Sequence, residues 1–205
     1  MMEIYAATKP QDGNTSNEDA FIIGRGQIPF AALCDGSGRA QQAGRRALAL
    51  FERLIGAATA EQIERFPTWD GWTRLLDSSL LGGAQSTFVA FAILDGRIVG
   101  ACAGDSRLYL LPSEGGIQIL TEEAPKLRLG SGEASPFAIH HRIQSGDILL
   151  LMSDGAWTPL NLGKLQALRA KSFNHHFSEF PMMILDEAGK NGNADDMTVI
   201  AFKVP

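Results

Sequence analysis

Residues 145–155, SGDILLLMSDG, place an acidic side chain directly behind an unbroken apolar run. The five apolar residues 148–152 predict a strand buried on both faces, and Asp154 and Gly155 follow it almost at once. A carboxylate at the end of so buried a strand needs a partner, because an isolated charge is costly to remove from water. A metal ion is one such partner.

Other acidic residues have the same placement. Glu18 and Asp19 open the apolar stretch 19–24, Asp35 ends another, and Asp195 precedes the last apolar stretch of the chain. Strand ends of one sheet can converge, and a hard dication takes about six oxygen ligands from carboxylates, carbonyls and water. The residue types therefore favour Mg²⁺ or Mn²⁺ over Zn²⁺.

A simpler interpretation is available for each acidic residue that precedes a glycine. Asp35-Gly36, Asp95-Gly96 and Asp154-Gly155 are all common turn sequences. Asp95 lies between two apolar runs, which is typical of a tight hairpin, and we assign it to a turn. Asp35 and Asp154 each follow a run that is too apolar for a turn to be the whole explanation.

Composition limits the function classes. With 205 residues, 45% apolar and 20% charged, the chain is expected to form one globular domain, 1–205. Its net charge is −5 and its basic residues are scattered, which argues against nucleic acid as a partner. No apolar run is long enough to cross a membrane, and the first residues do not resemble a secretory signal, so we expect a cytoplasmic protein.

The order of elements predicts an α+β protein. Apolar strands cluster in meanders, and two blocks of helical periodicity interrupt them, at 43–55 with part of 70–80, and at 157–171 with 180–189. This order favours antiparallel sheets stacked between helical layers over a parallel sheet. The expected strands are 3–8, 19–24, 29–35, 86–94, 97–104, 106–112, 116–121, 140–144, 147–153 and 197–204.

Six short motifs carry a resemblance to a known family. They are NEDAF (17–21), ALCDGSG (32–38), GGAQST (82–87), CAGDSRLYLL (102–111), SGDILLLMSDGAW (145–157) and DDMTVI (195–200). In this order they resemble the type 2C metal-dependent serine/threonine protein phosphatases. The resemblance implies a four-layer αββα sandwich, in which helices flank two antiparallel sheets.

The resemblance also implies an activity. The implied reaction is the hydrolysis of serine or threonine phosphomonoesters in a phosphorylated protein. The substrate is the product of a serine/threonine kinase. The implied nucleophile is a water that bridges two Mn²⁺ or Mg²⁺ ions. Such a pair of ions lowers the pKa of the water and neutralises the phosphate oxygens. The implied metal ligands are Asp19, Asp35, the carbonyl of Gly36, Asp154 and Asp195, with Glu18 acting through a water and Asp105 at a weaker third metal.

Two positions depart from the type 2C pattern. The family commonly has an arginine that clamps phosphate at the position of Asn14, and a histidine that protonates the leaving oxygen at that of Ser37. An amide lacks the charged fork of an arginine, so the affinity for phosphate should be lower unless Arg25 or Arg39 supplies the contact. The DGSGR turn before an alanine-rich helix resembles the stage II sporulation E branch instead. The short interval from Thr121 to Gly146 predicts a flap that is reduced or missing.

Two alternatives to an active protein phosphatase remain open from the sequence. One is a pseudophosphatase that binds phosphoproteins without turning them over, which the two departures favour. The other is a metal-dependent hydrolase of small phosphate esters. The sequence indicates neither the individual substrate nor the oligomeric state.

Overall fold

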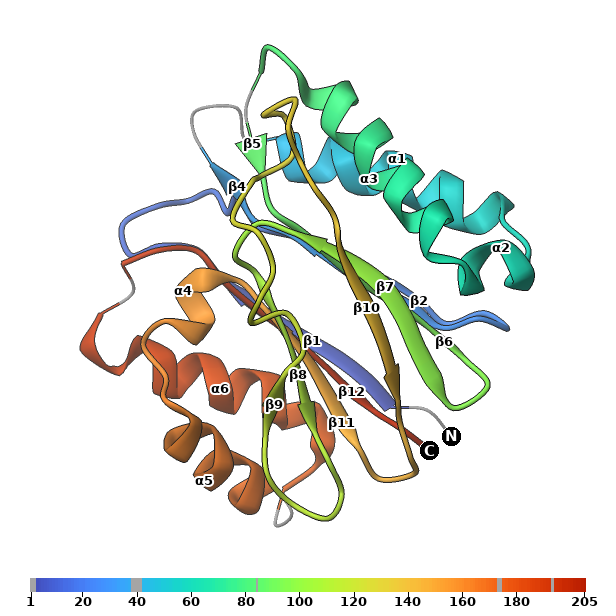
Figure 1. Ribbon diagram of the computed structural model, residues 1–205. Helices are drawn as coiled ribbons and strands as arrows, with labels where there is room; N and C mark the ends of the chain where they lie inside the picture. The colour runs from blue at the N-terminus through green and yellow to red at the C-terminus, as the bar shows by residue number, and fades with distance from the viewer. Residues whose placement is uncertain (1–2, 38–41, 84, 173–174, 193) are drawn as a thin grey trace. The chain divides into compact units, whose positions relative to one another are not determined.

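The computed structural model describes residues 3–37, 42–83, 85–172, 175–192 and 194–205 (Figure 1). The chain divides into two compact units. Unit 1 contains residues 1–17, 107–120 and 143–205, and unit 2 contains 18–106 and 121–142. Neither unit is a continuous segment, and for that reason we keep a single domain over residues 1–205 as a proposal.

Unit 1 is built on a five-stranded antiparallel sheet in the order β1-β12-β11-β8-β9. Its strands are β1 (Glu3–Lys9), β8 (Arg107–Leu111), β9 (Gln118–Ile119), β11 (Ile148–Met152) and β12 (Met197–Lys203). Its helices are α4 (Asp154–Trp157), α5 (Leu162–Ser172), α6 (Phe180–Ala188) and the 3₁₀ turns η1 (Phe177–Glu179) and η2 (Gly189–Asn191). In Figure 1, α6 lies along the sheet, against β1 and β12.

The apolar run 148–152 forms β11, the middle strand of this sheet. All five residues of β11 are buried, as continuous apolar character predicts. Alternate residues such as Leu150 pack in one cluster with Phe180 and Ile184 of α6. The run therefore ends at a fixed point, and Asp154 comes two residues after it.

Unit 2 contains a second five-stranded antiparallel sheet, in the order β10-β7-β6-β3-β2. Its strands are β2 (Ala20–Gly24), β3 (Phe30–Cys34), β6 (Phe88–Leu94), β7 (Arg97–Ala103) and β10 (Phe137–Arg142), and β4 (Gly36–Ser37) pairs with β5 (Gln85–Ser86) beside it. The helices α1 (Ala43–Ala57), α2 (Ala60–Glu64) and α3 (Phe66–Leu80) pack on this sheet (Figure 1).

Aromatic side chains fix the helices of unit 2. The ring of Phe51 on α1 lies 5.8 Å from that of Trp69 on α3 and 5.2 Å from that of Phe88 on β6. All three are almost completely buried. Such rings bury large apolar areas and prefer these tilted geometries. The helical period predicted for residues 43–55 is therefore explained by one packed face.

The expected α+β class, with helices flanking two antiparallel sheets, is confirmed. Most boundaries agree within a few residues. The helix expected over 157–171 is divided into α4 and α5, and the strand expected over 116–121 is reduced to the two residues of β9. Three further details differ. Helix α3 begins at Phe66 rather than near residue 70, because Pro67 lies in its first turn, a position that favours helix initiation. Helix α2 was not expected, although Thr59 and Gln62 form a capping box. Strand β10 begins at Phe137 rather than His140, since its register with β7 extends to Cys102.

The hairpin assigned to Asp95 is confirmed. Asp95 and Gly96 have φ values of 46° and 71° and connect β6 to β7. Two positive φ values are the requirement of the tight turn that matches the twist of paired strands. This aspartate is therefore explained by local structure alone.

The segment 121–136 contains turns and one isolated bridge between Leu129 and Ser86, and no helix or longer strand. This agrees with the expectation of a reduced flap. Among the described residues, no helix combines the length and apolar character that crossing a bilayer requires.

Candidate functional site

Asp154 and Asp195 of unit 1 lie at the same end of the sheet. Strands β11 and β12 are antiparallel neighbours with Met152 opposite Val199, so the end of one strand lies beside the start of the other. The buried hydroxyl of Ser153 accepts a hydrogen bond from the Thr198 N–H at 2.8 Å. This strand pairing fixes the backbone beside both carboxylates.

Gly155 allows the start of α4 to lie close to the loop before β12. A Cβ at Gly155 would lie 2.2 Å from the carbonyl oxygen of Asp196 and 3.2 Å from the Cβ of Asp195. Atoms cannot approach to 2.2 Å without a backbone shift, so only glycine lets α4 begin so close to the loop before β12. The residue is required for packing at this point, independently of any metal.

We expect Gly155→Ala to destabilise the protein by about 1–3 kcal/mol, the usual range for overpacking a buried site. Urea unfolding measures the free energy. Gly71→Ala in the middle of α3 is the matched control, because open space surrounds that position and alanine should stabilise the helix by about 0.5–1 kcal/mol. Equal effects of the two substitutions would contradict the close approach at Gly155.

The neighbouring loop of unit 1 is held by Asp196, not Asp195. The carboxylate of Asp196, which is 7% exposed, accepts a hydrogen bond from the Gln11 N–H at 2.7 Å. The side-chain amide of Asn14 donates to the Gln11 side chain at 2.8 Å. Asn14 is exposed on this loop. Asp195, which precedes Asp196 in the chain, is exposed as well. Asp196 is therefore a structural residue.

In unit 2, Asp19 and Asp35 flank one residue pair. Ala20 and Cys34 are opposite each other in β2 and β3, so the aspartate that precedes β2 and the one that follows β3 lie at the same end of the sheet. Their side chains are 7% and 8% exposed. Two carboxylates removed from water at one sheet end suit a bound cation.

The loop after Asp35 also passes close to the strand entry. A Cβ at Gly36 would lie 3.0 Å from the carbonyl oxygen of Glu18. Glu18, Asp19, Asp35 and Gly36 are thus held together within unit 2. Ser37 forms a strand pair with Gln85.

A buried hydroxyl network connects Asp35 to the GDSR turn. The N–H of Asp35 donates to the Thr87 hydroxyl at 2.9 Å, and that hydroxyl lies 2.7 Å from the hydroxyl of Ser106. The carboxylate of Asp105, next to Ser106, accepts a hydrogen bond from the Arg128 guanidinium at 3.1 Å. Ser106 is therefore a structural residue, and Asp105 has a cationic neighbour.

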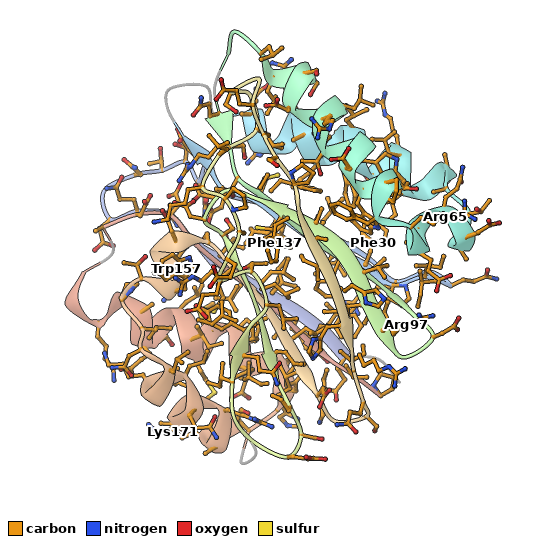
Figure 2. All side chains as sticks on the ribbon, viewed as in Figure 1. Phe30, Arg65, Arg97, Phe137, Trp157 and Lys171 are labelled. Carbon is orange, nitrogen blue, oxygen red and sulfur yellow. The ribbon has the colours of Figure 1, made fainter. Side chains whose placement is uncertain are left out.

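Arg107, which follows Ser106, contacts an aromatic ring. Its guanidinium lies 3.5 Å from the centre of the Trp157 ring, within the range of a cation–π contact. Figure 2 labels Trp157 on α4, the short helix that follows β11 in the chain. This contact orders the α4 turn, on which Asp154 is the first residue.

The two cysteines serve as small buried residues. Cys34 and Cys102 are both free and completely buried. Burial, followed by the nearby Asp105 carboxylate, raises the pKa of the Cys102 thiol to about 12, and burial also raises the pKa of Cys34. Both thiols stay protonated near neutral pH and are poor nucleophiles.

The structure divides the expected site residues between its two units. Unit 1 brings together Asp154 and Asp195, and unit 2 brings together Glu18, Asp19, Asp35, Gly36 and, through the hydroxyl network, Asp105. Arg25 follows the far end of β2 from Asp19, about 20 Å along a strand, so it does not replace the missing arginine. Arg39 lies outside the described residues.

Sequence reasoning missed two charged residues. Arg128 pairs with Asp105, and Lys164 lines a cavity together with Asp154 and Asp195. Neither has a local pattern around it: Arg128 lies in an irregular segment, and Lys164 lies on an exposed position of α5. Only the tertiary structure reveals their neighbours.

A family model agrees with these observations. Residues 30–205 match the model described as stage II sporulation protein E (SpoIIE). The chain belongs to the SpoIIE family. The match covers the DGSG turn, which is the feature that suggested this branch in the sequence, and both Asp154 and Asp195.

Solved structures share the whole fold of this SpoIIE-family chain. A serine/threonine phosphatase from S. agalactiae is 19% identical with a TM-score of 0.84, and 100% of each chain is covered. The catalytic domain of PstP, solved with two manganese ions, is 22% identical with a TM-score of 0.81 over 100% of this chain and 99% of that one. Stp1 from Staphylococcus aureus is 20% identical with a TM-score of 0.84, over 100% and 96%. Among curated protein sequences, none matches.

Proposed function

We propose that this chain is a divalent-metal-dependent phosphatase that hydrolyses serine or threonine phosphomonoesters in a phosphorylated protein. The observation that carries the proposal is the placement of carboxylates at matching strand ends: Asp154 with Asp195, and Asp19 with Asp35. Membership of the SpoIIE family and the fold shared with serine/threonine phosphatases support it. The substrate would be the product of a serine/threonine kinase.

The proposed metal ligands are the carboxylates of Asp19, Asp35, Asp154 and Asp195 with the carbonyl of Gly36, and Glu18 would act through a water. The donor set fits Mn²⁺ or Mg²⁺, because every donor is an oxygen and Asp19 and Asp35 are already removed from bulk water. The PstP structure with two manganese ions supports the choice of metal by analogy.

A weaker third ion would use Asp105. Arg128 donates a hydrogen bond to that carboxylate and competes for the same oxygen atoms. This pairing favours two firmly bound ions and a third one of lower affinity.

Two bound ions would supply the polarisation of phosphate oxygens and a water of lowered pKa for in-line attack. The protein holds the ligands in position: the Ser153–Thr198 hydrogen bonds fix the Asp154 backbone, and Thr87 fixes that of Asp35. The exposed amide of Asn14 would donate a neutral hydrogen bond to the phosphate, weaker than the bidentate contact of an arginine. Neither cysteine takes part, because both thiols are buried and protonated.

Hydrolysis of p-nitrophenyl phosphate by the purified chain tests the proposal. We expect turnover in Mn²⁺ or Mg²⁺ at least about tenfold above that in excess EDTA, since no cysteine or histidine ligand is proposed that would hold the metal tightly. Returning Mn²⁺ after chelation should restore the rate, which shows that the protein remained folded.

The other outcomes of this assay distinguish the alternative functions. Full activity in EDTA would contradict a metal-dependent mechanism. No turnover, combined with metal-dependent binding of a phosphoserine peptide, would favour the non-catalytic binding module. Hydrolysis of small esters without any phosphoprotein turnover would favour the small phosphate-ester hydrolase.

A further inference from the structure

A cavity of about 430 Å³ lies in unit 1 beside two of the proposed metal ligands. It is formed by α4, the start of α5, the end of α6 and the loop that precedes β12. Asp154, Gly155 and Asp195 line it on the side of the proposed ligands. Its volume lies within the range of cavities that enclose small ligands or single side chains.

Four of the eight remaining lining residues are apolar. They are Pro159, Ala188, Ala194 and Met197, and Ala188 and Met197 are only 4% and 2% exposed. Residues so buried provide a firm base, because packed interiors do not rearrange easily. An apolar group that entered here would leave water and contact carbon atoms.

Glu187 and Lys164, the charged lining residues outside the proposed ligand set, have partners within the protein. Lys190 Nζ lies 2.5 Å from one carboxylate oxygen of Glu187, and Lys164 Nζ lies 3.6 Å from the other. The hydrogen bond from Lys190 holds the pKa of Glu187 below its usual value. A charged ligand would have to disrupt these pairs, whereas an apolar one would not. The lining therefore favours an apolar occupant.

We propose that this cavity accepts an apolar side chain of the phosphoprotein substrate, one or two residues away from the phosphorylated serine or threonine. The inference rests on the proposed function, because Asp154 and Asp195 would then belong both to the metal site and to the cavity wall. An extended chain advances about 3.3–3.6 Å per residue, so a side chain next to the phosphoresidue reaches the adjoining space. The enzyme would thus select substrates with an apolar flanking residue.

Phosphoserine peptides that differ only at the flanking positions test the inference. The series places Leu, Ala or Glu one or two residues from the phosphoserine on either side. We expect kcat/KM for the best Leu peptide to exceed that of its Ala counterpart about tenfold, mainly through KM, since the contact is made equally in ground and transition states. The Glu peptide should be no better than the Ala peptide.

Filling the cavity should remove the preference. Thr158 is an exposed lining residue that follows α4, and Thr158→Trp should reduce the Leu to Ala ratio to about twofold or less. Gln166→Trp is the matched control, because Gln166 is exposed on α5 outside the cavity; it should keep the ratio. The ratio is internal to each variant and does not depend on its absolute rate. If Thr158→Trp fails to fold, Ala194→Trp carries the same test.

The outcomes separate this inference from the proposed function. Equal kcat/KM values for all peptides, or a preference for Glu, would overturn the cavity assignment while p-nitrophenyl phosphate turnover still supports the phosphatase. Loss of the Leu preference in Gln166→Trp as well would also overturn it. Absence of metal-dependent turnover with every substrate would overturn both.

Discussion

Asp154→Asn is expected to lower kcat/KM for phosphate esters by about 10³-fold while leaving the fold intact. A metal site supplies several kcal/mol of transition-state stabilisation, and each 1.36 kcal/mol is a factor of ten in rate. Asparagine keeps one oxygen ligand but removes the negative charge that holds the ion. Steady-state kinetics at saturating Mn²⁺ measures the loss.

The same substitution should stabilise the metal-free protein. Asp154 lies close to Asp195, because Gly155 allows the two backbones to approach. Neighbouring like charges repel each other in water by up to about 1 kcal/mol. Without metal, Asp154→Asn should therefore melt about 2–4 °C above the wild type. Added Mn²⁺ should raise the melting temperature of the wild type more than that of the variant.

Asp95→Asn is the matched control for both measurements. Asp95 is also an aspartate followed by glycine after an apolar strand, but its positive φ explains it as a hairpin residue. Asparagine tolerates this backbone conformation well. The control should keep the wild-type rate and its response to Mn²⁺. A wild-type rate in Asp154→Asn would remove that residue from the proposed ligand set.

The sequence was sufficient for those features that depend on local pattern. An unbroken apolar run identified β11, and two residues of turn chemistry identified the Asp95-Gly96 hairpin. Acidic residues at the ends of apolar runs indicated where a site could form, and the structure has Asp154 and Asp195 at one end of the unit 1 sheet and Asp19 and Asp35 at one end of the unit 2 sheet. That these carboxylates bind metal stays a prediction.

What the sequence could not provide depends on long-range contacts. The two-residue strands β4 and β5 have no periodicity, and they exist because Gly36 and Ser86 pair across 50 positions of the chain. The pairing of Arg128 with Asp105 and the cavity beside Lys164 have the same origin. Such features arise when separate elements fold together, and no window of the sequence contains both partners.

The second large effect concerns the leaving group. If Ser37 stands where relatives have the residue that protonates the leaving oxygen, aryl phosphates should be hydrolysed about 10²–10⁴ times faster than phosphoserine peptides, which is the usual contribution of a general acid. Phenolates leave without protonation, whereas a serine alkoxide does not. Measurement of kcat across phosphate esters of graded leaving-group pKa should give a steep dependence.

Two substitutions separate protonation from phosphate binding. Ser37→His should raise kcat for phosphoserine peptides and change that for aryl phosphates little, since only the poor leaving group needs the proton. Asn14→Arg should instead lower KM for both substrates, because a charged contact to phosphate is made in ground and transition states alike. Within the described residues Asn14 is exposed and its hydrogen bonds are local, to Gln11, so we expect the arginine to leave the fold unchanged. Equal rates for serine peptides and aryl esters, unchanged by Ser37→His, would mean that another residue donates the proton.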